Sequence, residues 1–190
     1  MCDPTVKYEP SQETLSGLME KIKLGISSCL LGEKVRYDGG HKLDRFLTDT
    51  LGQYVEYVPV CPEFECGLGV PRKHMHLEGK PDSPRLIITE TRQDETKRMV
   101  IWAQKRLIQL ENEDMRGFIF KSNSPSCGIN NVKVFNEKSI PVLTGMGIFA
   151  GILIKHFPSL PVEDEVHLHD PGLLKNFREM IFAFAKSCAK

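Results

Sequence analysis

The stretch GFIFKSNSPSCG, Gly117–Gly128, joins a short apolar run to a loop that carries one thiol. The apolar part, GFIFK, predicts a buried strand. Cys127 follows it within a few residues and stands between Pro125, which restricts the backbone, and Gly128, which frees it. A buried strand followed directly by a loop with one cysteine is therefore the local pattern from which we infer the rest of the fold.

The same unit occurs twice more, nearer the N-terminus. Cys29 follows the run KLGISS at 23–28, and Cys61 follows VEYVPV at 55–60. In a parallel α/β sheet, ligands bind outside the carboxyl ends of the strands. We therefore expect the thiols of Cys29, Cys61 and Cys127 to meet at one site despite their distance in sequence.

The pattern between and beyond these strands predicts the fold class. Strands alternate with amphipathic segments, which favours an α/β single-domain layered fold with a mainly parallel, Rossmann-like sheet flanked by helices. The expected helices are 12–21, 43–52, 91–114, 147–157 and 171–186, and the further strands are 85–90 and 132–135. Residues 1–22 are expected to be a lead-in with a possible short helix, and 23–190 the α/β domain.

Composition narrows the functional class. The chain has 190 residues, enough for one domain with a real core, and its 25 Lys+Arg balance its 25 Asp+Glu. That balance argues against a strongly basic nucleic-acid surface. No apolar stretch approaches the roughly 20 residues that span a bilayer, and the N-terminus lacks the pattern of a signal peptide. We expect a cytoplasmic protein with no membrane partner, whose cysteines are metal ligands or reactive thiols rather than disulfides.

Three thiols without an evident fourth ligand indicate an open coordination sphere. Structural zinc takes four ligands, commonly in close pairs, and the sequence contains no C-x-x-C. An iron–sulfur cluster held by three thiolates would leave one iron open for chemistry, and a proline directly after a cysteine, as in CPE at 61–63, is typical of such ligands. Cys66 is the candidate for a fourth ligand. The alternative for each cysteine is a small buried hydrophobe.

Four motifs, in this order along the chain, carry a resemblance to a known family. They are SSCLLGEKVRYDGGHK, CPEFECGLGVPR, KSNSPSCG and GMGIFAG. The chain resembles the TudS thiouracil desulfidases over about 23–186, in particular the branch that also forms the desulfidase half of the two-domain RudS proteins, which act on thiolated tRNA.

The resemblance implies a cofactor and two catalytic side chains. A [4Fe–4S] cluster would be held by Cys29, Cys61 and Cys127, with its fourth iron not bound by the protein. The catalytic glutamate of the family corresponds to Glu63 of CPE. The catalytic serine lies in the SPSC stretch, where we expect Ser124, with Ser126 as the alternative.

These residue types suit the hydrolysis of a thiocarbonyl group. An iron with an open position can bind the soft sulfur as a Lewis acid. Glu63 would serve as general base toward water, and Ser124 would hold the water or stabilise charge. Asp38 would accept a hydrogen bond from a pyrimidine N–H beside Gly39, unless the two residues form an ordinary Asp-Gly turn. Arg72 would pair with a substrate phosphate or with a protein carboxylate.

The resemblance implies conversion of thiouracil or 4-thiouridine-type substrates to uracil or uridine products with release of hydrogen sulfide. We expect a thiolated pyrimidine base, nucleoside or nucleotide as the substrate. Thiolated tRNA is a further possibility, although the RNA-binding extension of the longer relatives is absent from the sequence. Two alternatives remain open: a cluster-dependent sulfur transferase and a zinc-stabilised binding module.

Three further motifs are interpreted structurally. GMGIFA at 145–150 satisfies a dinucleotide-binding pattern, but it comes late in the chain, which favours close docking of a helix. HMH at 74–76 and EDEVHLHD at 163–170 are rich in potential metal ligands without the spacing of a zinc protease helix, so we expect solvated loops or helix caps.

Overall fold

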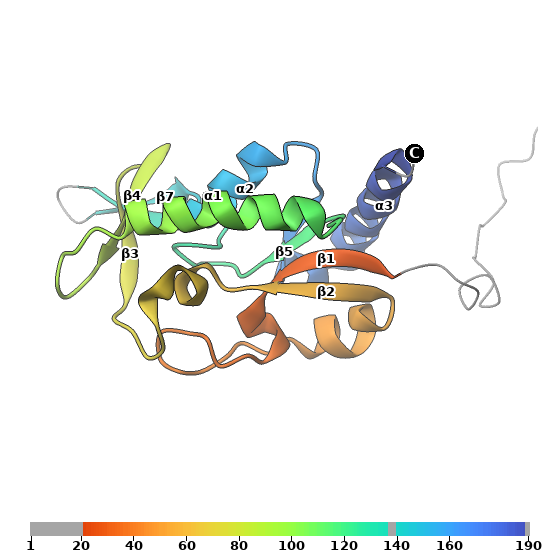
Figure 1. Ribbon diagram of the computed structural model, residues 1–190, viewed down its shortest axis with the longest axis horizontal. Helices are drawn as coiled ribbons and strands as arrows, with labels where there is room; N and C mark the ends of the chain where they lie inside the picture. The colour runs from red at the N-terminus through yellow and green to blue at the C-terminus, as the bar shows by residue number, and fades with distance from the viewer. Residues whose placement is uncertain (1–20, 137–139, 189–190) are drawn as a thin grey trace, which may run out of the picture.

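The computed structural model describes residues 21–136 and 140–188 (Figure 1). The helix expected over 12–21 falls outside these residues except for Lys21, which is not helical. The boundary expected between 22 and 23 lies at the edge of the described part and stays a prediction. No helix in the described part is long and apolar enough to cross a membrane.

The first sheet, which we call sheet A, is entirely parallel. Its strand order is β2-β1-β5-β8. The strands are β1 (Ile22–Ser27), β2 (Val55–Val60), β5 (Phe118–Phe120) and β8 (Val162–Asp164). The first three coincide with the strands expected from their apolar runs, to within one residue at either end. The mainly parallel sheet of the sequence analysis is therefore confirmed.

A second sheet, sheet B, was not expected. Its order is β4-β3-β6-β7, with antiparallel pairs at both ends and one parallel pair in the middle. The strands are β3 (Met75–Lys80), β4 (Ser83–Ile88), β6 (Val132–Phe135) and β7 (Pro141–Gly145). The interpretation of HMH as a solvated loop was wrong, because Met75 and His76 begin β3. Met75 and Leu77 are buried in the core, whereas His76 and Glu78 are half-buried. The strand therefore has the two-residue alternation of a β-strand, which its polar residues made hard to recognise in the sequence.

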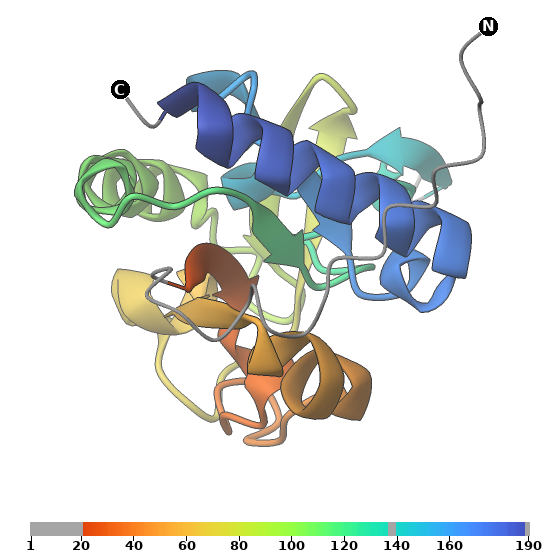
Figure 2. The same cartoon turned by 90° about the vertical axis from the view of Figure 1, so that its right-hand side faces the viewer.

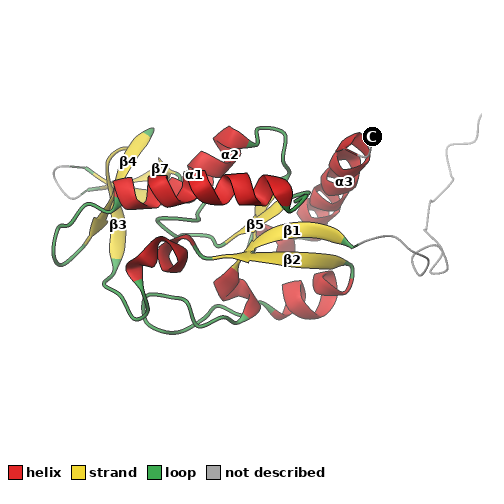
Figure 3. Cartoon of the chain, viewed as in Figure 1, coloured by secondary structure: helices red, strands yellow, loops and turns green. Residues whose placement is uncertain are grey.

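Three helices cover the sheets, and Figure 3 shows how much of the chain they and the strands occupy. They are α1 (Thr96–Asn112), α2 (Ile148–His156) and α3 (Pro171–Cys188), as expected except that α1 begins five residues late. The late start follows from a tight turn at Arg92, whose φ is 61°, after which residues 93–95 pair with β4, including an isolated bridge between Ile87 and Asp94. The helix expected over 43–52 is present as helical backbone over 45–53, which contains the π-helical η3 (Phe46–Thr50) and the 3₁₀-helical η4 (Leu51–Gln53). The remaining turns are η2 (Ser28–Leu31), η5 (Phe64–Leu68) and η6 (His167–His169).

The centre of sheet A is buried on both faces. Phe118 and Phe120 pack with residues of α1 and α2, among them Leu107 and Phe149. Ile119, between them, packs with Phe177 of α3, and Figure 2 shows α3 passing across β5. All three residues of β5 have no exposed surface. A strand covered on both faces reads as a continuous apolar run, which is why GFIFK predicts it so clearly.

Candidate active site

The three cysteines lie where strands of sheet A end, and they line one cavity of about 320 Å³. Cys29 is in η2 directly after β1, Cys61 follows β2, and Cys127 lies in the loop after β5. The expected convergence of the thiols is therefore observed. It comes from topology alone, since parallel strands place their carboxyl ends at the same edge.

The thiols lie in surroundings that disfavour an isolated thiolate. Cys29 and Cys127 are buried. Burial raises the pKa of Cys29 to about 11 and that of Cys61 to about 12, and it raises the pKa of Cys127 as well. Lys121 partly opposes the rise at Cys29, while the neighbouring cysteines add to it at Cys127. The protein alone therefore carries neutral thiols here near pH 7, and binding a metal centre would displace their protons.

Glu63 lies at the same cavity, at the residue before η5. Its two carboxylate oxygens have different partners. Oε1 accepts a hydrogen bond of 2.7 Å from the hydroxyl of Ser126. Oε2 accepts two N–H groups from Arg72, including Nε at 2.9 Å. With a side chain only 12% exposed, Glu63 is held in one orientation at the cavity wall.

The two candidate serines form a chain of hydroxyls that ends on this carboxylate. Ser124 Oγ lies 3.0 Å from Ser126 Oγ. Since the Ser126 proton is directed to Glu63, the Ser124 hydroxyl donates to Ser126. Ser124 Oγ also accepts backbone N–H groups from Ser126 at 3.3 Å and from Cys127 at 3.1 Å. Both serines line the cavity, and Ser126 is almost fully buried.

The start of α2 holds the loop 124–128 through main-chain contacts. The N–H of Gly147 donates to the carbonyl of Gly128 at 2.8 Å, and the N–H of Ala150 donates to the carbonyl of Ser126 at 3.1 Å. A Cβ at Gly147 would lie 2.5 Å from the backbone carbonyl of Ser126. The interpretation of GMGIFA as a close-docking motif is confirmed by these contacts, which fix the loop that carries Cys127.

The structure gives Arg72 a protein carboxylate as its partner. Besides Glu63, its guanidinium donates to the carbonyls of Val35 and Gly69, each at 2.9 Å. Four of its five N–H groups thus have partners. Arg72 lines the cavity with a side chain only 7% exposed.

Asp38 and Gly39 form the ordinary turn that was the alternative to a substrate contact. Asp38 Oδ1 accepts the N–H of Gly40 at 2.9 Å, and Gly39 has a positive φ of 75°. Neither residue belongs to the cavity lining, whereas the preceding Arg36 and Tyr37 do. A contact between Asp38 or Gly39 and substrate stays a prediction.

A polar group that sequence reasoning missed lies on the opposite wall. Lys121, Ser122 and Asn123 line the cavity directly after β5. Glu165, which follows β8 and is buried, forms an ion pair with Lys121 and accepts the N–H of Ser122 at 2.7 Å. The signal was present, because these residues follow a predicted strand at the edge where ligands bind.

Cys66 lies outside the cavity lining. Its thiol is 3.5 Å from the carbonyl oxygen of Glu63 and packs against the core cluster that contains α1. The three cavity thiols are thus distinct from this fourth one in the described part of the chain.

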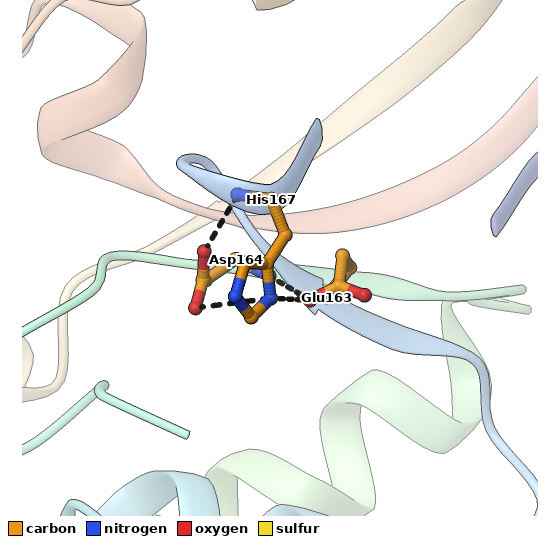
Figure 4. Close-up of side chains that lie close together, drawn as sticks. All are labelled: Glu163, Asp164 and His167. Carbon is orange, nitrogen blue, oxygen red and sulfur yellow. Dashed lines mark hydrogen bonds and ion pairs between the residues drawn. The ribbon is translucent and has the colours of Figure 1, made fainter. Parts of the chain in front are cut away.

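The acidic and histidine-rich segment 163–170 forms a separate cluster (Figure 4). Ligand atoms of Glu163, Asp164 and His167 lie within 4.8 Å of one another. Asp164 Oδ1 accepts the N–H groups of Val166 and His167, each at 3.0 Å, at the start of η6. Asp170 Oδ1 accepts the N–H groups of Gly172 at 2.8 Å and Leu173 at 2.9 Å and so caps α3. The hydrogen bond that His167 donates to the carboxylate of Glu163 raises the pKa of His167. The expected helix cap is therefore observed, preceded by the unexpected strand β8.

The donor set at the cavity fits an iron–sulfur centre. Soft thiolate ligands select such clusters, zinc or copper(I), and three cysteines line one cavity here, two of them buried and Cys61 half-buried. Fold and site together define a class: an α/β protein with three thiols at the carboxyl edge of a parallel sheet, beside a carboxylate joined to two hydroxyls.

Comparison with known proteins agrees with that class. The family model described as 2-thiouracil desulfurase matches residues 24–165, well over half of the chain, and the chain belongs to this family. It is 30% identical over 135 residues to the uncharacterised protein YbbK of Bacillus subtilis (strain 168), covering 67% of this chain and 87% of that protein.

A solved structure shares the fold. It is that of a [4Fe-4S]-dependent thiouracil desulfidase, TudS, with a TM-score of 0.63 and 29% sequence identity. The match covers 84% of this chain and 99% of the solved chain. The resemblance to the TudS family in the sequence analysis is thereby confirmed.

Proposed function

We propose that this protein is a [4Fe–4S]-dependent desulfidase that replaces the sulfur of a thiolated pyrimidine with oxygen. The observation that carries the proposal is the meeting of Cys29, Cys61 and Cys127 with Glu63 at one cavity. The reaction balances without an electron carrier: the thiocarbonyl compound and water give the carbonyl compound and hydrogen sulfide.

The cysteines would hold the cluster by three of its irons. When bound, the cluster supplies a Lewis-acidic iron with no protein ligand, which draws electron density from a thiocarbonyl carbon through its sulfur. The remaining wall of the cavity, which includes Glu63 and Ser124, is left for the substrate and water.

Glu63 is the proposed general base and then general acid. Its Oε1 takes a proton from the water that attacks the thiocarbonyl carbon, and the same proton is returned to the departing sulfur. The carboxylate is oriented for this role because Oε2 is held by Arg72 and Oε1 faces the hydroxyl chain.

Ser124 is the proposed catalytic hydroxyl, with Ser126 linking it to Glu63. The Ser124–Ser126–Glu63 chain lines the cavity and can relay the effect of the carboxylate to a water held there. Ser126 is the alternative, since its hydroxyl contacts Glu63 directly.

The proposed substrates are thiouracil and 4-thiouridine-type compounds, as base, nucleoside or nucleotide, in the cytoplasm. A sulfur transferase and a zinc-stabilised module are the competing functions, and thiolated tRNA is the competing substrate. One experiment separates all of these. Anaerobically reconstituted protein is incubated with 4-thiouracil, 4-thiouridine, its 5′-monophosphate and thiolated tRNA, without reductant, in water enriched in ¹⁸O.

The proposal expects iron and acid-labile sulfide in the protein, release of hydrogen sulfide, and ¹⁸O at the former thiocarbonyl carbon. Sulfur found on an acceptor would indicate the transferase, and a colourless zinc protein would exclude cluster chemistry. A strict need for an electron donor would overturn the hydrolytic mechanism.

Cysteine variants test the site itself. Replacing Cys29, Cys61 or Cys127 with alanine should abolish the visible absorbance of the cluster and all turnover. Cys66→Ala is the matched control and should keep both, because its thiol lies outside the cavity lining. Loss of the cluster in Cys66→Ala would contradict the three-ligand assignment.

A further inference from the structure

Arg72 connects two loops at the cavity. Its guanidinium contacts Glu63 and Gly69 of the loop after β2, and Val35 of the loop after β1. Its own N–H donates to the carbonyl of Tyr37 at 2.9 Å. The Val35 carbonyl that it binds also faces the thiol of Cys61 at 3.7 Å. The Arg72 side chain thus fixes the position of Glu63, the proposed general base, relative to the loop that carries Cys61.

The way Arg72 binds Glu63 leaves one carboxylate oxygen free for other partners. Both N–H groups go to the same oxygen, Oε2, with Nε at 2.9 Å. Oε1 is therefore left to Ser126. In a fork that used both oxygens, Oε1 would be shared with the guanidinium and would be a weaker acceptor for the hydroxyl chain.

We propose that Arg72 is a positioning residue, which clamps Oε2 of Glu63 so that Oε1 faces the Ser126 hydroxyl and the cavity. The inference rests on the proposed function and deepens it. It replaces a substrate contact by Arg72, which its four partnered N–H groups leave little capacity to make.

The first test separates positioning from substrate binding. Arg72→Lys keeps the positive charge but cannot reach Glu63 and both carbonyls from one ammonium. We expect kcat to fall about 10- to 100-fold, as for groups that orient a reacting ligand, with KM within about twofold of the wild type and iron content unchanged. A raised KM with unchanged kcat would overturn the proposal in favour of a substrate contact.

Arg92→Lys is the matched control. Arg92 forms an ion pair with Glu78 in sheet B, away from the cavity lining, so the same replacement should leave kcat and KM unchanged. An equal fall in kcat in this control would show that the Arg72 effect is not specific.

A double-mutant cycle tests whether Arg72 acts through Glu63. In the Glu63→Gln background, Arg72→Lys should cause little further loss of kcat, because the carboxylate that it orients is gone. Additive losses would overturn the proposal.

The same cycle is measured on cluster-free protein by urea unfolding. The drop in midpoint caused by Arg72→Lys should be clearly smaller in the Glu63→Gln background, and additive midpoints would overturn the clamp. This readout needs neither the cluster nor turnover. An inactive wild-type protein would refute the proposed function while the coupling between Arg72 and Glu63 is still measured.

Discussion

Two arginine–glutamate pairs, one at the cavity and one in sheet B, show how a single interaction is put to different uses. Arg92 and Glu78 meet as a fork, with each terminal nitrogen on its own oxygen, and the Arg92 side chain is 62% exposed. Arg72 and Glu63 are nearly buried, at 7% and 12%, and share a single oxygen. Oε1 of Glu78 is shared between Arg92 and His76, whereas Oε1 of Glu63 is not contacted by its guanidinium and accepts the Ser126 hydroxyl.

The difference extends to the sheets that carry the pairs. Sheet A is parallel and sends each cysteine loop of the cavity to one edge, while in the described part of the chain no cysteine directly follows a strand of sheet B. Sheet B does border the site, through Met75, but its Glu78 pairs with His76 and Arg92 away from the cavity lining. The residues of the candidate site therefore lie where the parallel strands of sheet A bring their loops together.

The largest expected difference between the two glutamates is in turnover. Glu63→Gln should retain the cluster but lower kcat by about 10²–10⁴-fold, because an amide cannot take a proton from water. Glu78→Gln, the matched change in sheet B, should leave kcat unchanged. Steady-state kinetics with iron quantification measures both, and near-normal kcat in Glu63→Gln would remove Glu63 from the mechanism.

The hydroxyl chain should show the next largest effect. Ser124→Ala should bind substrate yet lower kcat by about 10²–10³-fold, the range for removing one donor at a reacting centre. Ser126→Ala should be milder, about 10-fold, as expected for a group that orients another. Single-turnover assays on loaded protein give both numbers. If Ser126→Ala lowers kcat severely and Ser124→Ala does not, the catalytic hydroxyl is that of Ser126 and not that of Ser124.

Close packing at α2 gives a smaller effect, on stability. Gly147→Ala places a Cβ 2.5 Å from the carbonyl of Ser126 and should destabilise the protein by about 1–3 kcal/mol and weaken cluster binding. Gly151→Ala, one turn further along α2, meets only Met146 Sδ at 3.7 Å and should not destabilise. Thermal unfolding compares the two, and equal melting temperatures would show that the loop yields to the extra atom.

The smallest expected effect is a change in acid stability. Arg92, and then His76, lower the pKa of Glu78 from 4.5 to about 2. Because the folded pKa is the lower one, the pair contributes stability above pH 4.5 and loses it as the pH falls toward 2. Glu78→Gln should therefore flatten the fall in unfolding free energy between these values. An unchanged slope in urea titrations at several pH values would contradict this contribution.

The sequence predicts sheet A better than sheet B for a physical reason. β1 and β5 are apolar runs because they are largely covered, β2 has buried valines at both of its ends, and β6 shows a clear alternation. β3 carries His76 and Glu78 on its less buried side, and β8 is three residues long with two acids. Such strands are specified by their neighbours in the sheet rather than by their own letters.

The candidate site likewise has a part that the sequence predicts and a part that it does not. The meeting of the cysteines follows from strand direction, so it was predictable. The contacts of Glu63 with Ser126, 63 residues away, and with Arg72 depend on how three loops fold over one another. No local pattern specifies such contacts, and for that reason the sequence left open both the partner of Arg72 and the choice between Ser124 and Ser126.

The docking of α2 on the loop 124–128 has a consequence for the order of events during synthesis. Cys29 and Cys61 leave the ribosome long before Ala150, whose N–H holds the Ser126 carbonyl beside Cys127. At roughly 5–20 residues per second, the 121 residues from Cys29 to Ala150 take on the order of 10 s to make. During that interval the first two thiols exist without a formed third. A cluster held by all three cysteines, as proposed above, would therefore form only after α2 has been made and has fixed the loop of Cys127.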